Sequence, residues 1–131
     1  MYLLAHSQAG LPLPEKAPTI HFTSQEHIRT LLGCVRCRPS GAQIREDVYV
    51  DEALDFSHAY EASILLHELV HYLQQGHIKF AHLSGCQRER AKEQEAYAIQ
   101  NAYLAALHSE QRVTFYGGEF DCAAEASPPA K

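Results

Sequence analysis

The segment His67-Glu68-Leu69-Val70-His71 decides how this chain is interpreted. Residues four apart lie on one face of an α-helix, so the imidazoles of His67 and His71 can converge on a single metal ion. Glu68 directly follows the first histidine, where it can hold and deprotonate a metal-bound water instead of binding the metal. The surrounding residues 62–73 are largely apolar, which is typical of a buried helix. The spacing therefore predicts a hydrolytic zinc site on this helix.

An accidental match is the alternative, because the chain contains nine histidines. Two imidazoles and a carboxylate would then lie on a buried helix with no metal to bind. Each unsatisfied polar group that is buried costs about 1–3 kcal/mol. This cost favours the metal site over the accident.

Length and composition are typical of one globular domain. The chain has 131 residues, of which 46% are hydrophobic, too many for a disordered protein. Its formal net charge is -5 and its basic residues form no long run, so we expect no nucleic-acid partner. No apolar stretch approaches the roughly 18 residues that a membrane-spanning helix needs. These features are typical of a globular domain for which neither nucleic-acid binding nor a membrane span is expected.

The four cysteines are Cys34, Cys37, Cys86 and Cys122. They permit three disulfide connectivities, of which we favour Cys34–Cys37 with Cys86–Cys122. Two disulfides indicate an oxidising compartment, so we expect an exported or periplasmic protein. Four reduced thiols in a cytoplasmic protein are the alternative, since the chain begins without an intact signal peptide.

The hydrophobic pattern predicts an α+β domain that is mainly helical. Capping residues and helical periodicity predict three helices, at residues 23–33, 57–75 and 87–107. Two β-prone runs, at 19–22 and 48–50, predict a small sheet with the second strand at its edge. The expected organisation is an irregular N-terminal arm, a central domain and a partly flexible tail, at residues 1–17, 18–112 and 113–131.

A catalytic zinc site needs a third protein ligand, and Glu95 is our candidate. Its neighbours on the predicted helix are alanine and isoleucine, which indicates a buried face. Glu93 is the rival, but it lies about 200° around the helix beside charged residues. His77 fits less well, because the chain lacks the glycine that would turn it out of the helix before that position.

The motif at residues 67–71, followed by Gln94-Glu95-Ala96 on the next long helix, resembles the gluzincin metallopeptidases. Short chains of this size resemble the minimal gluzincins, and the match covers roughly residues 45–107. The resemblance implies a zincin-like domain with one Zn²⁺ bound by the two histidines and Glu95. It further implies that Glu68 is the general base, assisting attack of zinc-bound water on a peptide or protein substrate.

The resemblance also implies an oxyanion donor and a substrate-binding edge strand. Tyr116 and His108 are candidates for the donor, and Val48-Tyr49-Val50 is the expected edge strand over the site. Members of the family commonly have an aspartate one turn after the glutamate ligand, where it accepts a hydrogen bond from the first histidine. Here that position is Ile99, so the sequence does not identify the hydrogen-bond partner of His67.

A latent or non-catalytic zinc-binding protein is the alternative function. The pair Gly117-Gly118 could act as a hinge that lets residues 119–122 fold back over the metal. A carboxylate or thiolate of that segment could then fill the open position on the zinc. The sequence therefore predicts either an active peptidase or one that its own tail or a partner blocks.

Overall fold

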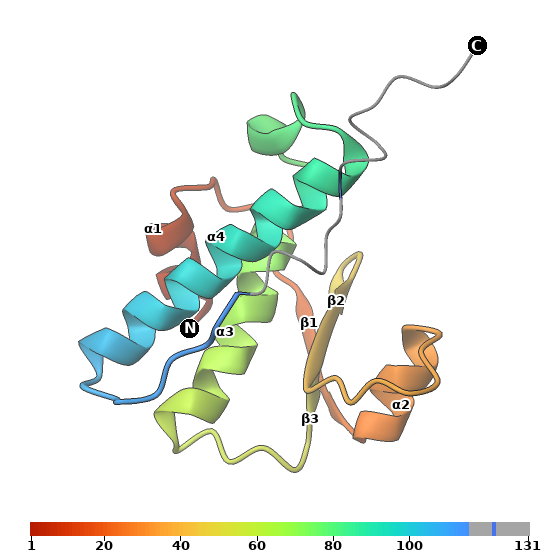
Figure 1. Ribbon diagram of the computed structural model, residues 1–131, viewed down its shortest axis with the longest axis vertical. Coiled ribbons are helices and arrows are strands. Elements are labelled where there is room, and N and C mark those ends of the chain that lie inside the picture. Colours follow the sequence, from red (N-terminus) through yellow and green to blue (C-terminus); the bar gives the residue numbers. More distant parts are fainter. Residues whose placement is uncertain (116–121, 123–131) are drawn as a thin grey trace.

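The computed structural model describes residues 1–115 and Cys122, and it shows an α+β fold (Figure 1). In this part of the chain, four α-helices and one 3-10 helix pack with a three-stranded sheet. The elements are α1 (Tyr2–Ala9), β1 (Thr19–Thr23), α2 (Gln25–Leu31), β2 (Gly41–Ile44), β3 (Asp47–Asp51), α3 (Ala59–Gln74), η1 (Ile78–Phe80) and α4 (Gly85–Ala106). The predicted fold class is confirmed.

The sheet has the order β1-β3-β2, with β3 parallel to β1 and antiparallel to β2. Val48 and Val50 of β3 are fully buried, and Val48 belongs to the core that contains Leu66 and Leu69 of α3. Tyr49 points to the opposite face, where its ring meets His27 of α2. The sheet therefore lies between α3 and α2.

The strand predicted at residues 48–50 exists, but its predicted place at the edge is wrong. Its backbone is paired on both sides, so it offers no free hydrogen-bonding groups to a substrate. The edge strand beside α3 is β2, which pairs only with β3 within the sheet. A β-prone run of valines indicated a strand, but its position in the sheet depends on pairing that the run itself does not specify.

The prediction of an irregular arm at residues 1–17 is wrong for its first half. Helix α1 occupies Tyr2–Ala9 and packs against α3. Its Ala5 and Ala9 are buried with Leu11 in the main core, so this segment is part of the domain. The sequence pattern did not predict this helix, because its apolar residues are not arranged on one face.

Helices α3 and α4 pack against each other and form the framework of the site (Figure 1). One face of α3 contributes Leu66, Leu69, Val70 and Leu73 to the core. Helix α4 contributes Ala96 and Ile99, whose small and branched side chains allow the two helices to lie close together. Both helices agree with their predicted positions within a few residues.

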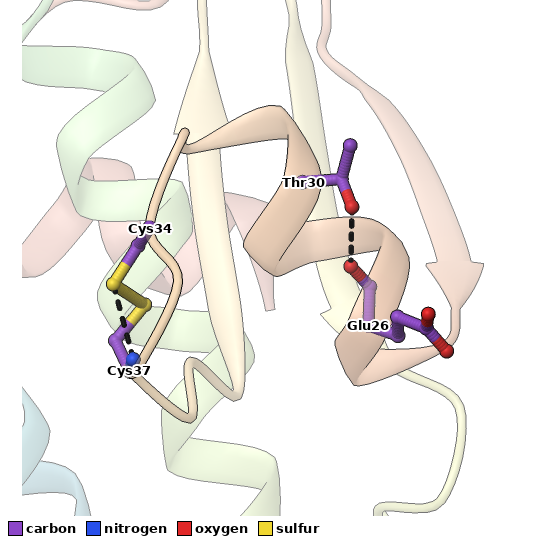
Figure 2. The surroundings of a disulfide bond; sticks show 4 residues. All are labelled: Glu26, Thr30, Cys34 and Cys37. Carbon is purple, nitrogen blue, oxygen red and sulfur yellow. Dashed lines mark hydrogen bonds between the residues drawn. A yellow bond between two sulfur atoms is a disulfide. The ribbon is translucent and has the colours of Figure 1, made fainter.

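Both predicted disulfides are present. Cys34–Cys37 closes a tight turn just after α2, where the Cys37 N–H also donates to Cys34 Sγ (3.1 Å; Figure 2). Cys86–Cys122 joins the first turn of α4 to the chain that follows this helix. The two crosslinks are compatible with an exported protein. Among the described residues, no helix is long and apolar enough to cross a membrane.

Removing the Cys86–Cys122 crosslink is expected to destabilise the fold more than removing Cys34–Cys37. The first pair is 36 residues apart and the second only three, so the first restricts the unfolded chain more strongly. Loop-closure entropy predicts losses of roughly 4 and 2 kcal/mol in the free energy of unfolding. Urea denaturation of the two double serine variants measures this difference. A larger loss of stability on removing Cys34–Cys37 would contradict the assignment of Cys86–Cys122 as the more stabilising disulfide.

Candidate metal centre

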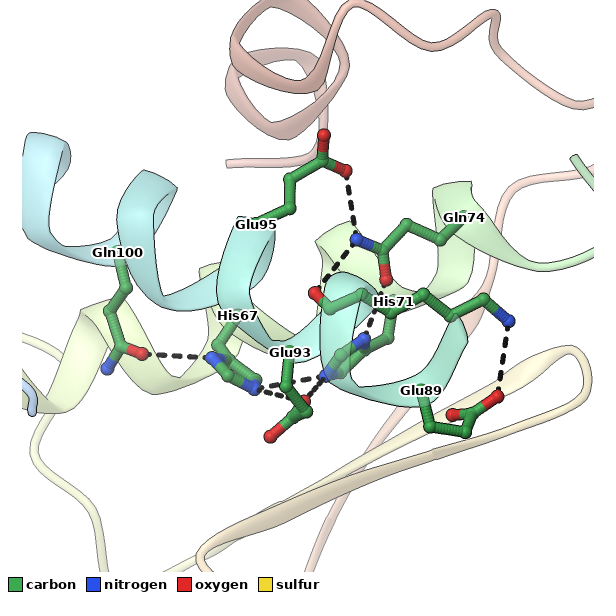
Figure 3. A network of polar contacts seen from close by, with 8 residues as sticks. His67, His71, Gln74, Glu89, Glu93, Glu95 and Gln100 are labelled. Atoms are coloured by element: carbon green, nitrogen blue, oxygen red, sulfur yellow. Dashed lines mark hydrogen bonds and ion pairs between the residues drawn. The ribbon is translucent and has the colours of Figure 1, made fainter. Parts of the chain in front are cut away.

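Three potential ligand atoms from α3 and α4 converge on one point (Figure 3). His67 and His71 lie one turn apart on α3, with their Nε2 atoms 3.0 Å from each other. Glu93 reaches them from α4, with Oε1 3.2 Å from His67 Nε2 and in direct contact with His71 Nε2. The group combines two imidazoles with one carboxylate.

The spacing of these atoms fits a zinc ion. Zinc binds nitrogen and oxygen ligands at about 2.0–2.2 Å in tetrahedral geometry, which places neighbouring ligand atoms roughly 3.3 Å apart. Two of the three separations, 3.0 and 3.2 Å, are close to this value, while His71 Nε2 and Glu93 Oε1 are in direct contact and would separate around a bound ion. Three protein ligands also leave a fourth position for water or substrate, as in catalytic zinc sites.

Glu95 does not belong to this group, which corrects its prediction as the third ligand. Its Oε1 accepts a hydrogen bond from Gln74 Nε2 (2.9 Å), and its Oε2 pairs with Lys79. Two residues along a helix correspond to a rotation of about 200°, so Glu93 and Glu95 face different neighbours. The charged residues around Glu93 had suggested that it faces solvent. In the structure Glu89 pairs with Lys92, and Glu93 contacts the two histidines instead.

His67 is oriented by a chain of hydrogen bonds whose directions are determined. The Ser63 hydroxyl donates to the Tyr60 carbonyl (2.5 Å), so its oxygen accepts from Gln100 Nε2 (2.9 Å). Gln100 Oε1 then faces His67 and accepts a hydrogen bond from its Nδ1 (3.0 Å). A protonated Nδ1 leaves the lone pair of a neutral imidazole on Nε2, where the metal would lie.

Gln100 is therefore the partner of His67 that the sequence did not reveal. It lies seven residues after Glu93, two helical turns along the same face of α4. On the helix it points about 140° away from Glu95, so the choice of Glu95 as a ligand does not lead to it. A search for a polar residue at this spacing from Glu93 would have found it.

The charges in the group shift the pKa values of its acids and bases. Burial would raise the pKa of Glu93, but the interactions of its carboxylate with His67 and His71 outweigh this effect and lower the pKa to about 2. Burial would lower the pKa of His71, but the carboxylates of Glu93 and Glu68 raise it. Burial also raises the pKa of Glu68, against the opposing effect of the two histidines. Glu93 is thus ionised at neutral pH, as a metal ligand must be.

A cavity of about 350 Å³ opens beside His67 and Glu68. Its other walls come from the start of β2 and from aromatic and apolar side chains, including Ser40, Gly41, Tyr60, Tyr97 and Val113. A Cβ on Gly41 would lie 2.9 Å from Glu68 Cγ, so only glycine lets β2 approach Glu68 this closely. Glu68 is therefore held between the edge strand and the histidines.

His108, one of the two predicted oxyanion donors, does not line this cavity. His108 is exposed beyond the end of α4, about 20 Å along the helix axis from Glu93, so its prediction is wrong. Tyr116 lies outside the described residues. Tyr97, which the sequence analysis missed, lines the cavity with its ring 4.6 Å from that of His67. Tyr97 lies one helical turn after Glu93 and therefore on the same face of α4, which is how the sequence could have indicated it.

The fold and site define an α+β domain with a candidate His-His-Glu metal centre at the edge of a cavity. Residues 2–123 match the model of DUF6647, a domain of unknown function, and the chain belongs to this family. No curated protein and no solved structure matches it.

Proposed function

We propose that this protein is a zinc-dependent peptidase. The observation that carries the proposal is the convergence of two histidine Nε2 atoms and a carboxylate on one point, with Glu68 beside a cavity. The orientation of His67 supports it, because a buried network of Ser63 and Gln100 directs the Nε2 lone pair to that point. An accidental motif would not require such support.

Glu68 supplies the acid–base chemistry in this proposal. A bound zinc ion contributes Lewis acidity, which polarises a carbonyl and lowers the pKa of water to about 7. Glu68 accepts the proton of the attacking water and afterwards donates it to the leaving amine. The position of Glu68 suits both transfers, because its side chain lines the cavity next to His67.

An extended peptide is the substrate that the surroundings favour. A second cavity, of about 470 Å³, lies one turn further along α3 and is lined by Gln43, His71, Gln75, Lys92 and other residues. Glu93 lines both cavities, and β2 borders both through Gly41 and Gln43. A peptide paired with the free edge of β2 would therefore cross the metal group.

A latent zinc-binding protein is the second candidate, favoured by the chain that follows α4. Val113 forms part of the cavity wall and is held there by Asn101. Asn101 Oδ1 accepts from the Val113 N–H (2.7 Å), and Asn101 Nδ2 donates to the Val113 carbonyl (2.8 Å). The thiolate form of this hypothesis fails, because Cys122 is bonded to Cys86. The proposed hinge and the carboxylate of Glu119 lie outside the described residues.

Metal removal tests the proposed function. Dialysis against a chelator is expected to abolish cleavage of an unstructured protein such as casein, and one equivalent of Zn²⁺ should restore it. Mg²⁺ is the control and should not restore activity, because it prefers octahedral oxygen ligands. Cleavage that survives chelation would contradict the peptidase mechanism. Stoichiometric zinc without cleavage would favour the latent protein.

The two crosslinks support a proposal about the compartment. Both cysteine pairs are joined, and the structure describes no free cysteine. We propose that the protein is exported and works in an oxidising environment, where such bonds persist.

A further inference from the structure

We propose that Glu95 is a positioning residue for His71, acting through the side chain of Gln74. This inference rests on the proposed function, because it assigns His71 as a metal ligand. Gln74 lies between the two residues: its Nε2 donates to Glu95 Oε1 (2.9 Å), and its Oε1 accepts from His71 Nδ1 (2.8 Å; Figure 3). Glu95 itself does not touch the metal group.

The orientation of the Gln74 amide is determined by its neighbours. The side chain is only 1% exposed, so water cannot substitute for its partners. Its Nε2 meets the Lys92 carbonyl (3.1 Å) and the Glu95 carboxylate, and both of these groups only accept hydrogen bonds. A flipped amide would place its oxygen against two acceptors, which is unfavourable. Gln74 Oε1 must therefore face His71.

This orientation determines which nitrogen of His71 is free. Because Gln74 Oε1 is an acceptor, His71 Nδ1 carries the proton of that hydrogen bond. The lone pair of the neutral imidazole then lies on Nε2, the atom that approaches His67 and Glu93. Without Glu95 the amide loses one of the two acceptors that hold it, and both the rotamer of Gln74 and the ring of His71 become less constrained.

Lys79 pairs with the oxygen of Glu95 that Gln74 does not use. Its Nζ pairs with Glu95 Oε2 and lies 3.5 Å from the carbonyl of Ala9, at the last residue of α1. The carboxylate therefore uses one oxygen for the lysine and the other for Gln74. This division explains why an acidic residue lies here, outside the metal group, among the small side chains of α4.

The test compares the zinc affinities of matched variants by competition with a chromophoric chelator. Glu95→Ala is expected to bind one zinc with an affinity about 10- to 100-fold below wild type, the usual effect of losing an outer hydrogen-bond partner of a metal ligand. Glu95→Gln should recover most of this loss, since its amide oxygen can still accept from Gln74. Lys79→Gln is the control: it removes the ion pair but leaves the bond to Gln74, so its zinc affinity should stay near wild type.

A spectroscopic readout separates positioning from general stability. In zinc-loaded wild type labelled with ¹⁵N, the His71 Nδ1–H should give a signal protected from solvent, and Glu95→Ala should expose it to exchange. Wild-type affinity and an unchanged signal in Glu95→Ala would overturn the positioning role alone. Complete loss of zinc in Glu95→Ala would also overturn it, since Glu95 would then be a ligand. Absence of zinc from wild type would instead overturn the proposed function.

Discussion

Replacing Glu93 by alanine is expected to remove zinc from the protein and with it all peptide cleavage. Glu93 provides the only carboxylate oxygen in the group of converging atoms within the described residues. Its loss leaves two histidine ligands, so zinc affinity should fall by more than the roughly 100-fold typical of an outer hydrogen-bond partner. Zinc content after dialysis and the rate of peptide cleavage measure the two effects.

The matched control is Gln94→Ala, the position next to Glu93 on the same helix. Gln94 is exposed and lines neither cavity, so zinc and activity should both be retained. Zinc bound at full stoichiometry by Glu93→Ala would show that another residue completes the site. In that case the ligand set assigned from the geometry would be wrong.

Replacing Glu68 by glutamine is expected to abolish turnover while zinc stays bound. Glutamine has nearly the same shape, so the contact with Gly41 is preserved. It cannot accept a proton, and general-base catalysis typically contributes a factor of about 10²–10⁴ in rate. The turnover of a fluorogenic peptide, with zinc content determined on the same sample, measures this separation.

Glu52→Gln is the control for Glu68→Gln, because it removes an exposed carboxylate just after β3. It should leave both turnover and zinc content unchanged. Activity in Glu68→Gln within tenfold of wild type would mean that another group takes the proton. Loss of zinc in this variant would mean that Glu68 binds the metal directly.

The motif on α3 could be predicted because its chemistry and its periodicity agree. His67 and His71 are four residues apart, and the flanking apolar residues require a buried helix, so local sequence determines their convergence. The cysteine pairing was also predicted, although the four cysteines alone permit three pairings. The histidine pair could be predicted because it depends on short-range spacing, and the disulfides because only three pairings are possible.

The third ligand could not be predicted, because it depends on how α4 is rotated against α3. Both Glu93 and Glu95 lie on a helix with small and charged residues on several faces, and its sequence pattern does not favour one rotation. Packing of Ala96 and Ile99 into the core selects the rotation that brings Glu93 and Gln100 to the histidines. The central position of β3 could not be predicted for a similar reason, because it depends on pairing with β1, which is distant in the sequence.

The side chains around the site form an organised set of supports. Gln100 orients His67, Gln74 orients His71, and each amide is itself held by a further partner, Ser63 or Glu95. Supports of this kind reduce the reorganisation that metal binding requires. They also distinguish this group from a chance cluster of polar residues, in which nothing would select one nitrogen of each ring.

X-ray absorption at the zinc edge, on wild-type protein of known zinc content, tests the central claim most directly. The structure predicts one zinc per chain, two imidazole ligands and further nitrogen or oxygen scatterers at about 2.0–2.2 Å. Sulfur should be absent, because all four cysteines are in disulfides. Sulfur scattering at about 2.3 Å, or a protein that retains no zinc after incubation with the metal, would contradict the site of His67, His71 and Glu93.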